Sequence, residues 1–168
     1  YKNILLVGVE ELSKLIDWND RSTCVVFGDG AGAAVVTAAD HGLEGFVQWS
    51  DGVGGEVLTC PGRKMENPWK ENASEKEYIQ MNGQEVFRFA VKKVPECIRQ
   101  VTEKTGTQIE TIDWFILHQA NSRIIQSVAK RLEVPEEKFP MNMERYGNTS
   151  AASIPILLDE LNKKGMLQ

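Results

Sequence analysis

Trp114-Phe-Ile-Leu-His-Gln-Ala-Asn121 is the stretch of sequence that says most about the fold. The apolar run from Ile112 to Leu117 predicts a buried strand, and apolar residues recur at helical spacing from Ala120 to Leu132. His118 therefore lies at a predicted strand-to-helix junction. Junctions of this kind, at the carboxyl ends of strands, are where open α/β sheets bind ligands.

A second segment, Tyr146-Gly-Asn-Thr-Ser-Ala-Ala-Ser153, places Asn148 in front of another predicted helix. Asparagine at such a position is commonly a helix N-cap, and a histidine after a strand is often only a structural donor. Together, His118 and Asn148 offer two neutral donors, each followed by small residues that permit close backbone approach. Two donors aimed at one carbonyl oxygen would form an oxyanion site.

The second half of the chain reads as alternating helices and strands. We expect helices over 84–104 and 149–164 and a short strand over 139–142, a pattern typical of an α/β layer with parallel strands. Pro95 predicts a kink in the first helix or the start of a second one.

In the first half, the loop over 52–74 is expected to separate two structural halves. The predicted strands before that loop are residues 3–9, 23–27, 33–38 and 46–49.

The glycine-rich run from Gly28 to Ala33 formally matches the dinucleotide-binding pattern G-x-G-x-x-A. The residues that follow it, from Ala34 to Ala38, are strand-like, whereas that pattern needs a helix to hold the pyrophosphate. We therefore prefer a tight hairpin turn with close backbone packing. A nucleotide site stays open as an alternative that a strand after Gly32 would eliminate.

Composition excludes several classes of function. The chain has 168 residues, of which 42% are hydrophobic and 26% charged, as in a soluble globular domain. It lacks an apolar run of roughly 18 residues and a secretory signal pattern, so we expect a cytoplasmic protein that does not enter membranes. The net charge of −5 argues against nucleic-acid binding.

The three cysteines, Cys24, Cys60 and Cys97, form no Cys-x-x-Cys pair and have no histidine at ligand spacing. Neither disulfides nor a metal site are therefore expected.

The predicted helix from Ala120 to Leu132 has an apolar face and an outer basic face with Arg123 and Lys130, while Arg131 lies on the border. With Arg88 on the preceding helix, these cations could recruit an acidic partner. A charged outer face is, however, usually only solvated.

Four segments, in order along the chain, resemble motifs of the β-ketoacyl-[acyl-carrier-protein] synthase III family. The resemblance covers essentially the whole chain, and His118 and Asn148 keep the family's separation. The segments are Asp20-Arg-Ser-Thr-Cys-Val-Val-Phe-Gly-Asp-Gly-Ala-Gly-Ala33, Met81-Asn-Gly-Gln-Glu-Val-Phe87, His118-Gln-Ala-Asn121 and Tyr146-Gly-Asn-Thr-Ser-Ala-Ala-Ser153.

The resemblance implies an α/β, thiolase-like fold of two similar halves in a layered αβαβα arrangement. Residues 1–51 would be the end of the first half, 52–80 a connecting loop, and 81–168 the second half without its final strands. The family's nucleophilic cysteine belongs before Tyr1, so the chain alone is expected not to condense. The full-length protein is expected to be a homodimer.

The implied activity is the condensation that starts bacterial fatty-acid synthesis. Family members move an acyl group from coenzyme A to a cysteine and condense it with malonyl-acyl-carrier protein, losing carbon dioxide. The coenzyme A thioester is a substrate, and no cofactor or metal is implied. His118 and Asn148 would hydrogen-bond the malonyl thioester oxygen as the enolate forms.

The resemblance also implies roles for other residues of this chain that match the family's motifs. Arg21 matches an arginine that packs on the adenine of coenzyme A, and Gln84 replaces an asparagine common in the family. The residues that match the pantetheine channel are Gly83, Phe87 and Asn121. The residues that match the carrier-protein surface are Gln119, Ala120, Asn121, Ser122 and Arg123, with the basic Arg88, Lys130 and Arg131.

Two further functions stay open at this point. One is another thiolase-like acyltransferase, such as a hydroxymethylglutaryl-CoA synthase or a polyketide or alkylquinolone starter enzyme. The other is a non-catalytic half-fold that only binds coenzyme A or a carrier protein.

Overall fold

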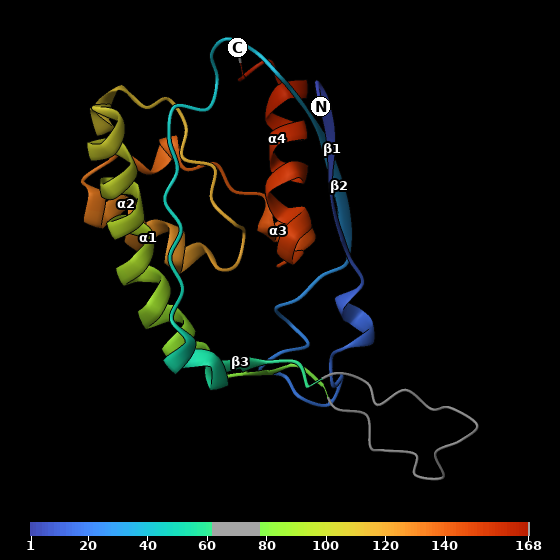
Figure 1. Cartoon of the computed structure of the whole chain (residues 1–168). Coiled ribbons are helices and arrows are strands. Elements are labelled where there is room, and N and C mark those ends of the chain that lie inside the picture. Colours follow the sequence, from blue (N-terminus) through green and yellow to red (C-terminus); the bar gives the residue numbers. More distant parts are fainter. Residues whose placement is uncertain (62–77, 168) are drawn as a thin grey trace.

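The structure, a computed structural model, describes residues 1–61 and 78–167 of the chain. Two groups of elements lie side by side: helices α1 and α2 on one side, and strands β1 and β2 with helix α4 on the other (Figure 1). Part of the loop predicted over 52–74 lies outside the described residues.

The main hydrophobic core lies where α1 (Gly83–Thr105) packs against α2 (Ser122–Leu132). The amide N–H at the start of each helix is capped by an asparagine side chain: Asn82 Oδ1 accepts from Glu85 N at 3.2 Å, and Asn121 Oδ1 from Arg123 N at 2.8 Å. Both helices were predicted. The core side chains are Val91, Phe115, Ile124, Ile125, Val128, Ala129, Leu132, Val134 and Phe139.

Strands β1 (Asn3–Glu10) and β2 (Gly30–Thr37) form an antiparallel pair in which Gly8 lies opposite Gly32. Helix α4 (Ser153–Lys163) packs on the face that carries these glycines, as Figure 1 shows. A Cβ on Gly8 would lie 2.6 Å from the Ala151 carbonyl oxygen. Because glycine has no Cβ, the start of α4 can approach the sheet backbone directly.

Short elements complete the fold. They are the strands β3 (Leu58–Thr59) and β4 (Gln80–Met81), the helix α3 (Met143–Tyr146), and 3-10 turns at Leu12–Lys14, Gly52–Val57, Ile109–Thr111, Glu136–Lys138 and Ser150–Ala152.

Four predicted strands are wrong: residues 23–26 form turns, and 46–49, 112–117 and 139–142 belong to no ladder. One backbone bond, from Phe115 N to Lys138 O at 2.8 Å, links 112–117 to the residue just before 139–142. An apolar run becomes a strand only when a neighbouring strand pairs with it. The ladders β1–β2 and β3–β4 are antiparallel, whereas the isolated bridge between Phe27 and Asn148 is parallel.

Two smaller predictions also change. Helix α1 runs from Gly83 to Thr105 through Pro95, so no second helix begins there. Helix α4 begins at Ser153 rather than at 149, after the 3-10 turn Ser150–Ala152.

The glycine-rich run from Gly28 to Ala33 is not the predicted hairpin turn, because Gly30 already pairs in β2 with Glu10. The strand continues past Gly32 to Thr37, which eliminates the dinucleotide-site alternative. The close backbone packing was predicted correctly: a Cβ on Gly32 would lie 2.9 Å from Pro155 Cγ.

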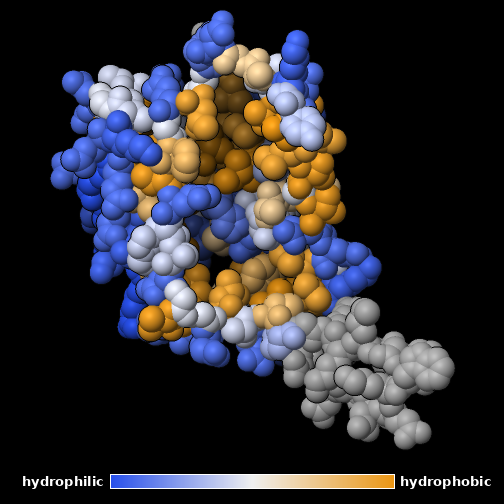
Figure 2. All heavy atoms as spheres, in the orientation of Figure 1, coloured by the Kyte–Doolittle hydropathy of each residue, from blue (hydrophilic) through white to orange (hydrophobic). Residues whose placement is uncertain are grey.

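The apolar side chains of the β1–β2 pair are largely exposed. Leu5 and Val35, which lie opposite each other, are 66% and 67% exposed. Figure 2 shows apolar side chains along the edge where these strands lie and around a hollow in that face of the molecule. Across residues 1–61 and 78–167, no helix is long and apolar enough to cross a membrane.

We predict that Gly28→Ala lowers the stability of the protein. A Cβ at this position would lie 2.1 Å from the Tyr146 carbonyl oxygen, so the backbone must shift. Such overpacking costs about 1–3 kcal/mol and should lower the urea-unfolding midpoint. Gly54→Ala is the matched control, since its Cβ would have no neighbour within 4 Å. Equal midpoints for the two variants would contradict this packing.

Candidate functional site

Asn148 is held by its backbone between two residues of the N-terminal half. Its N–H donates to the Val26 carbonyl at 2.9 Å, and its carbonyl accepts from Gly28 N at 2.9 Å. The side-chain oxygen accepts from Ser150 N at 2.9 Å. Because the oxygen is engaged there, the amide group Nδ2 is the part of the side chain available to donate to a ligand.

His118 follows the extended segment that ends at Leu117. Its Nδ1 lies 2.6 Å from Ser153 Oγ, at the first turn of α4. The residue as a whole is exposed to solvent. The protein around the ring removes part of its hydration, and this desolvation lowers the pKa of His118 below its ordinary value. The imidazole is therefore neutral near pH 7.

Gln119 is buried, with 1% of its surface exposed. Its Nε2 donates to the Leu117 carbonyl at 2.8 Å, and its Oε1 accepts from Asn142 N at 3.1 Å. These bonds tie the segment before α2 to the segment before α3. The side chain is thus a structural support. Because it is buried, Gln119 is not part of an exposed surface for a carrier protein, contrary to the prediction.

His118 and Asn148 lie on the wall of one cavity, whose volume is about 390 Å³. The wall is otherwise mostly apolar, so a charge that developed inside it would be poorly screened by water. The apolar side chains of the wall include Val26, Phe27, Leu58, Met81, Val86, Phe87, Phe89, Val94, Leu117, Ile124 and Ile125.

The residues predicted to line the pantetheine channel reach this same cavity. Gly83 and Phe87 at the start of α1 lie on its wall, together with Ala120 and Asn121 before α2. Arg21 is exposed in the turn region before Phe27 and is not among the wall residues.

The basic residues do not form one cluster. Arg123 borders a depression that shares Ala120, Asn121 and Asn148 with the cavity, so it stands at the rim. Arg88 lies at the start of α1 and forms an ion pair with Glu85.

Lys130 and Arg131 are exposed in the last turn of α2, away from the end that carries Arg123. Ser122, at the first position of α2, is exposed beside Arg123.

The three cysteines are unpaired, and none is among the cavity's wall residues. Cys60 is exposed, while Cys24 and Cys97 are partly buried. Within residues 1–61 and 78–167, no group of three or more His, Cys, Asp or Glu side chains could hold a metal ion.

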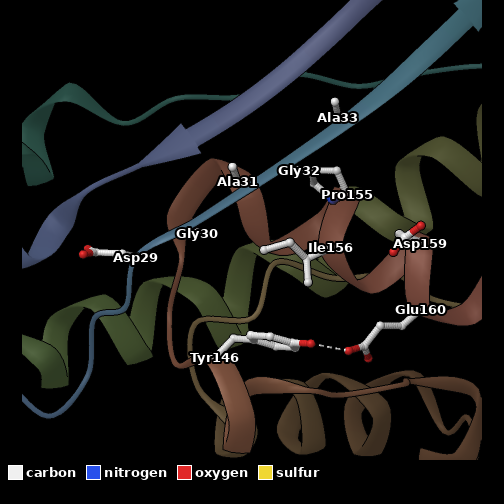
Figure 3. Close-up of a pocket in the computed structure, with 10 residues that line it drawn as sticks. All are labelled: Asp29, Gly30, Ala31, Gly32, Ala33, Tyr146, Pro155, Ile156, Asp159 and Glu160. Carbon is white, nitrogen blue, oxygen red and sulfur yellow. Dashed lines mark hydrogen bonds between the residues drawn. The ribbon is translucent and has the colours of Figure 1, made fainter.

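A second, more acidic hollow lies between β2 and α4 (Figure 3). There Tyr146 donates to Glu160 Oε1 at 2.7 Å, and this hydrogen bond raises the pKa of Tyr146. Arg145 pairs with the other oxygen of Glu160 at 2.5 Å. Glu160 thus anchors α3 to α4 and steadies the turn that carries Asn148.

Sequence reasoning missed the residues that hold the two donors, namely Ser150 and Ser153. The available signal was their positions two and five residues after Asn148, three apart from each other, which suit local hydrogen bonds at a helix start. That spacing does not reveal that Ser153 also contacts a histidine 35 positions earlier.

Family models match both ends of the chain. The model described as 3-oxoacyl-[acyl-carrier-protein] synthase III matches residues 1–52, and the model of its C terminal matches residues 102–168. The β-ketoacyl-[acyl-carrier-protein] synthase III of Clostridium novyi is 50% identical over 169 residues, covering 99% of this chain and 52% of the relative. That of Clostridium acetobutylicum is 48% identical and covers 100% of this chain and 52% of the relative.

Solved structures of synthase III proteins are also similar to this chain. The 3-oxoacyl-[acyl-carrier-protein] synthase III of Aquifex aeolicus superposes with a TM-score of 0.86 at 43% identity, covering 99% of this chain and 51% of that one. The Thermus thermophilus synthase III also gives a TM-score of 0.86, at 44% identity, over 99% of this chain and 52% of that one. The chain spans about half the length of the relatives it matches.

The class of protein is therefore an α/β protein with a thiolase-like fold, as the sequence predicted. Within that class, the chain belongs to the β-ketoacyl-[acyl-carrier-protein] synthase III family.

The lowered pKa of His118 predicts a pH-dependent loss of stability. Between the folded pKa and the unfolded value of about 6.5, the unfolded chain binds a proton that the folded chain does not. The free energy of unfolding should therefore fall as the pH drops below about 6.5. Urea unfolding of the wild type and of His118→Gln across this range measures the effect, which the variant should lack.

His41→Gln is the matched control, since His41 is the other histidine of the chain and is exposed. It should keep the part of the pH dependence that His118 causes. If His118→Gln unfolded with the same pH dependence as the wild type, the desolvation of this ring would be refuted.

Proposed function

We propose that this chain supplies the decarboxylation part of the active site of a β-ketoacyl-[acyl-carrier-protein] synthase III. The reaction condenses an acyl-CoA primer with malonyl-acyl-carrier protein and starts fatty-acid synthesis. The observation that carries the proposal is the placement of His118 and Asn148 on one mostly apolar cavity wall. The relatives' names support the same reaction.

In the proposed step, the malonyl C–C bond to the carboxylate breaks and carbon dioxide leaves. The electron pair of that bond forms an enolate, and negative charge develops on the thioester oxygen. Asn148 Nδ2 donates to this oxygen, as does His118 Nε2 when it carries a proton. Fixed donors on a mostly apolar wall stabilise such a charge more than water does, because they need no reorientation.

The enolate carbon then attacks the carbonyl carbon of an acyl-cysteine thioester. A new C–C bond forms, and the cysteine sulfur leaves as a thiolate. Cys24, Cys60 and Cys97 are all absent from the cavity wall. We therefore assign the decarboxylation step to this chain and none of its cysteines to the acyl transfer.

The cavity also suits the arm that delivers the malonyl group. A phosphopantetheine arm is narrow and largely extended, and the wall near the start of α1 pairs the aromatic Phe87 with Gly83, which has no side chain. Asn121 is exposed at the same wall and offers an amide to the arm. Arg21, exposed outside the cavity, is available to pack on the adenine of coenzyme A.

The carrier protein is proposed to dock at the rim marked by Arg123, with Ala120, Asn121 and Ser122 beside it. An acidic partner there would place its arm at the cavity. Arg88, Lys130 and Arg131 would add longer-range attraction from the two helices.

A non-catalytic module that binds coenzyme A or a carrier protein is the second candidate. The absence of a cysteine from the cavity wall favours it. Such a module would bind malonyl thioesters without releasing carbon dioxide, so a decarboxylation assay separates the two functions.

We predict that Asn148→Asp nearly abolishes decarboxylation. The change replaces the donor Nδ2 with a negative oxygen beside the developing enolate, and losing one oxyanion donor costs about 10²–10³ in rate. Release of carbon dioxide from malonyl thioester by the intact gene product measures it. Asn162→Asp, the same change at an exposed position of α4, is the control and should stay near the wild-type rate. Wild-type activity in Asn148→Asp would rule out this role.

We also predict that Arg123→Glu weakens the use of the carrier protein selectively. Reversing a rim charge opposite an acidic partner should raise KM for malonyl-acyl-carrier protein by roughly tenfold at low salt and less at high salt. KM for malonyl-CoA should change little. Lys163→Glu, an exposed cation of α4, is the matched control. An equal effect of both variants would place the docking surface elsewhere.

A further inference from the structure

The hydroxyl of Ser153 is surrounded by three polar atoms. Its Oγ lies 2.6 Å from His118 Nδ1, 2.8 Å from the Ser150 carbonyl oxygen and 3.3 Å from the backbone N of Gln119. The side chain is buried, with 2% of the residue exposed. The hydroxyl therefore depends on these protein atoms, rather than on water, for its hydrogen bonds.

The Ser153 hydroxyl has one hydrogen, so it can donate to only one of these three neighbours. The Ser150 carbonyl can only accept, and the Gln119 N–H can only donate, whereas Nδ1 of a neutral imidazole does either. If Ser153 donates to Ser150, then Nδ1 must carry the ring proton and donate to Oγ. If Ser153 donates to Nδ1 instead, the ring proton is on Nε2.

The first arrangement satisfies more groups. It makes all three hydrogen bonds, whereas the second leaves the Ser150 carbonyl facing an oxygen lone pair at 2.8 Å. The Ser150 carbonyl accepts the backbone N–H of Ser153 in both arrangements, so what separates them is this close contact, which is a hydrogen bond in the first and a contact between lone pairs in the second. The ligand-free protein should therefore hold the proton on Nδ1 and carry a lone pair on Nε2.

We propose that Ser153 is a positioning residue that selects the tautomer of His118. Turned toward the Ser150 carbonyl, its hydroxyl keeps the resting proton on Nδ1. Turned toward Nδ1, it leaves the proton on Nε2, where His118 donates to the enolate oxygen. This second state rests on the proposed function, and the resting state does not.

The change between the states is balanced. Between the two states one proton is released from Nδ1 to the solvent and one is taken up from the solvent at Nε2, so the ring is neutral in both states. The Ser153 hydroxyl rotates, and the bond from Gln119 N is kept in both states. Which ring nitrogen of a histidine is protonated is commonly set by the partner of the other nitrogen.

The test is nitrogen-15 NMR of the protein with labelled histidine. Protonated and unprotonated ring nitrogens have well-separated shifts, and the chain has only two histidines, so His118→Gln assigns the signals. We expect the ligand-free protein to carry the proton on Nδ1. Ser153→Ala removes the acceptor for that proton and should move it mainly to Nε2.

Ser150→Ala is the matched control. Ser150 takes part through its backbone carbonyl, so this variant should keep the proton on Nδ1. A wild-type ring protonated on Nε2, or a Ser153→Ala ring identical to wild type, would overturn the proposal. The wild-type measurement decides even if Ser153→Ala fails to fold.

A kinetic readout tests the second state. In Ser153→Ala the ring proton is already on Nε2, the nitrogen that donates to the enolate oxygen, so kcat for malonyl decarboxylation should stay at or above the wild-type value, with little change in KM. Ser153→Thr keeps the hydroxyl and should behave like the wild type. A wild-type protein without decarboxylation would refute the proposed function while leaving the NMR result for the resting tautomer intact. A tenfold or larger loss of kcat in Ser153→Ala would refute the switch.

Discussion

The geometry of the site depends on the backbone of Asn148, which is bonded on both sides to the segment from Val26 to Gly28. This short parallel contact joins residues more than a hundred positions apart. It is possible because Gly28 has no Cβ, since a Cβ would meet the Tyr146 carbonyl oxygen at 2.1 Å. A bulkier residue would push the two segments apart and move Asn148 with them.

Once Asn148 is held, the turn that follows it controls both proposed donors. Ser150 N fixes the carboxamide of Asn148, and Ser153 Oγ contacts the imidazole of His118. Ser150 has a φ of 47°, an uncommon conformation for a residue other than glycine. Such a residue persists when its surroundings hold it, and here the turn aims one N–H at Asn148 and one carbonyl at Ser153. One four-residue segment therefore sets how the amide and the imidazole are presented to the cavity.

The helices could be predicted because their signals are local. Caps at Asn82 and Asn121 and the 3.6-residue period of α1 and α2 need no distant partner. The run from Ile112 to Leu117 is equally apolar, but whether it becomes a strand depends on what pairs with it, and sequence does not show this. The open face of β1 has the same cause, since burial of a sheet depends on what packs over it.

The same distinction between local signals and distant partners applies to the site. His118 and Asn148 were found as a pair because each stands at a helix entrance, and they do lie on one cavity wall. Gln119 was taken for a surface residue, although its side chain is buried in bonds to Leu117 and Asn142. The partnership of Ser153 with His118 joins distant segments, and local spacing could not reveal it.

The central claim is that His118 and Asn148 donate to one thioester oxygen. Isotope-edited infrared spectroscopy of a bound malonyl thioester analogue that cannot lose carbon dioxide, labelled with carbon-13 at the thioester carbonyl, tests this directly. Two donors should polarise the C=O bond and shift its stretch to lower frequency than in water, with part of the shift lost in Asn148→Ala and part in His118→Ala. A carbonyl stretch that is the same in the wild type and in both variants would contradict the account.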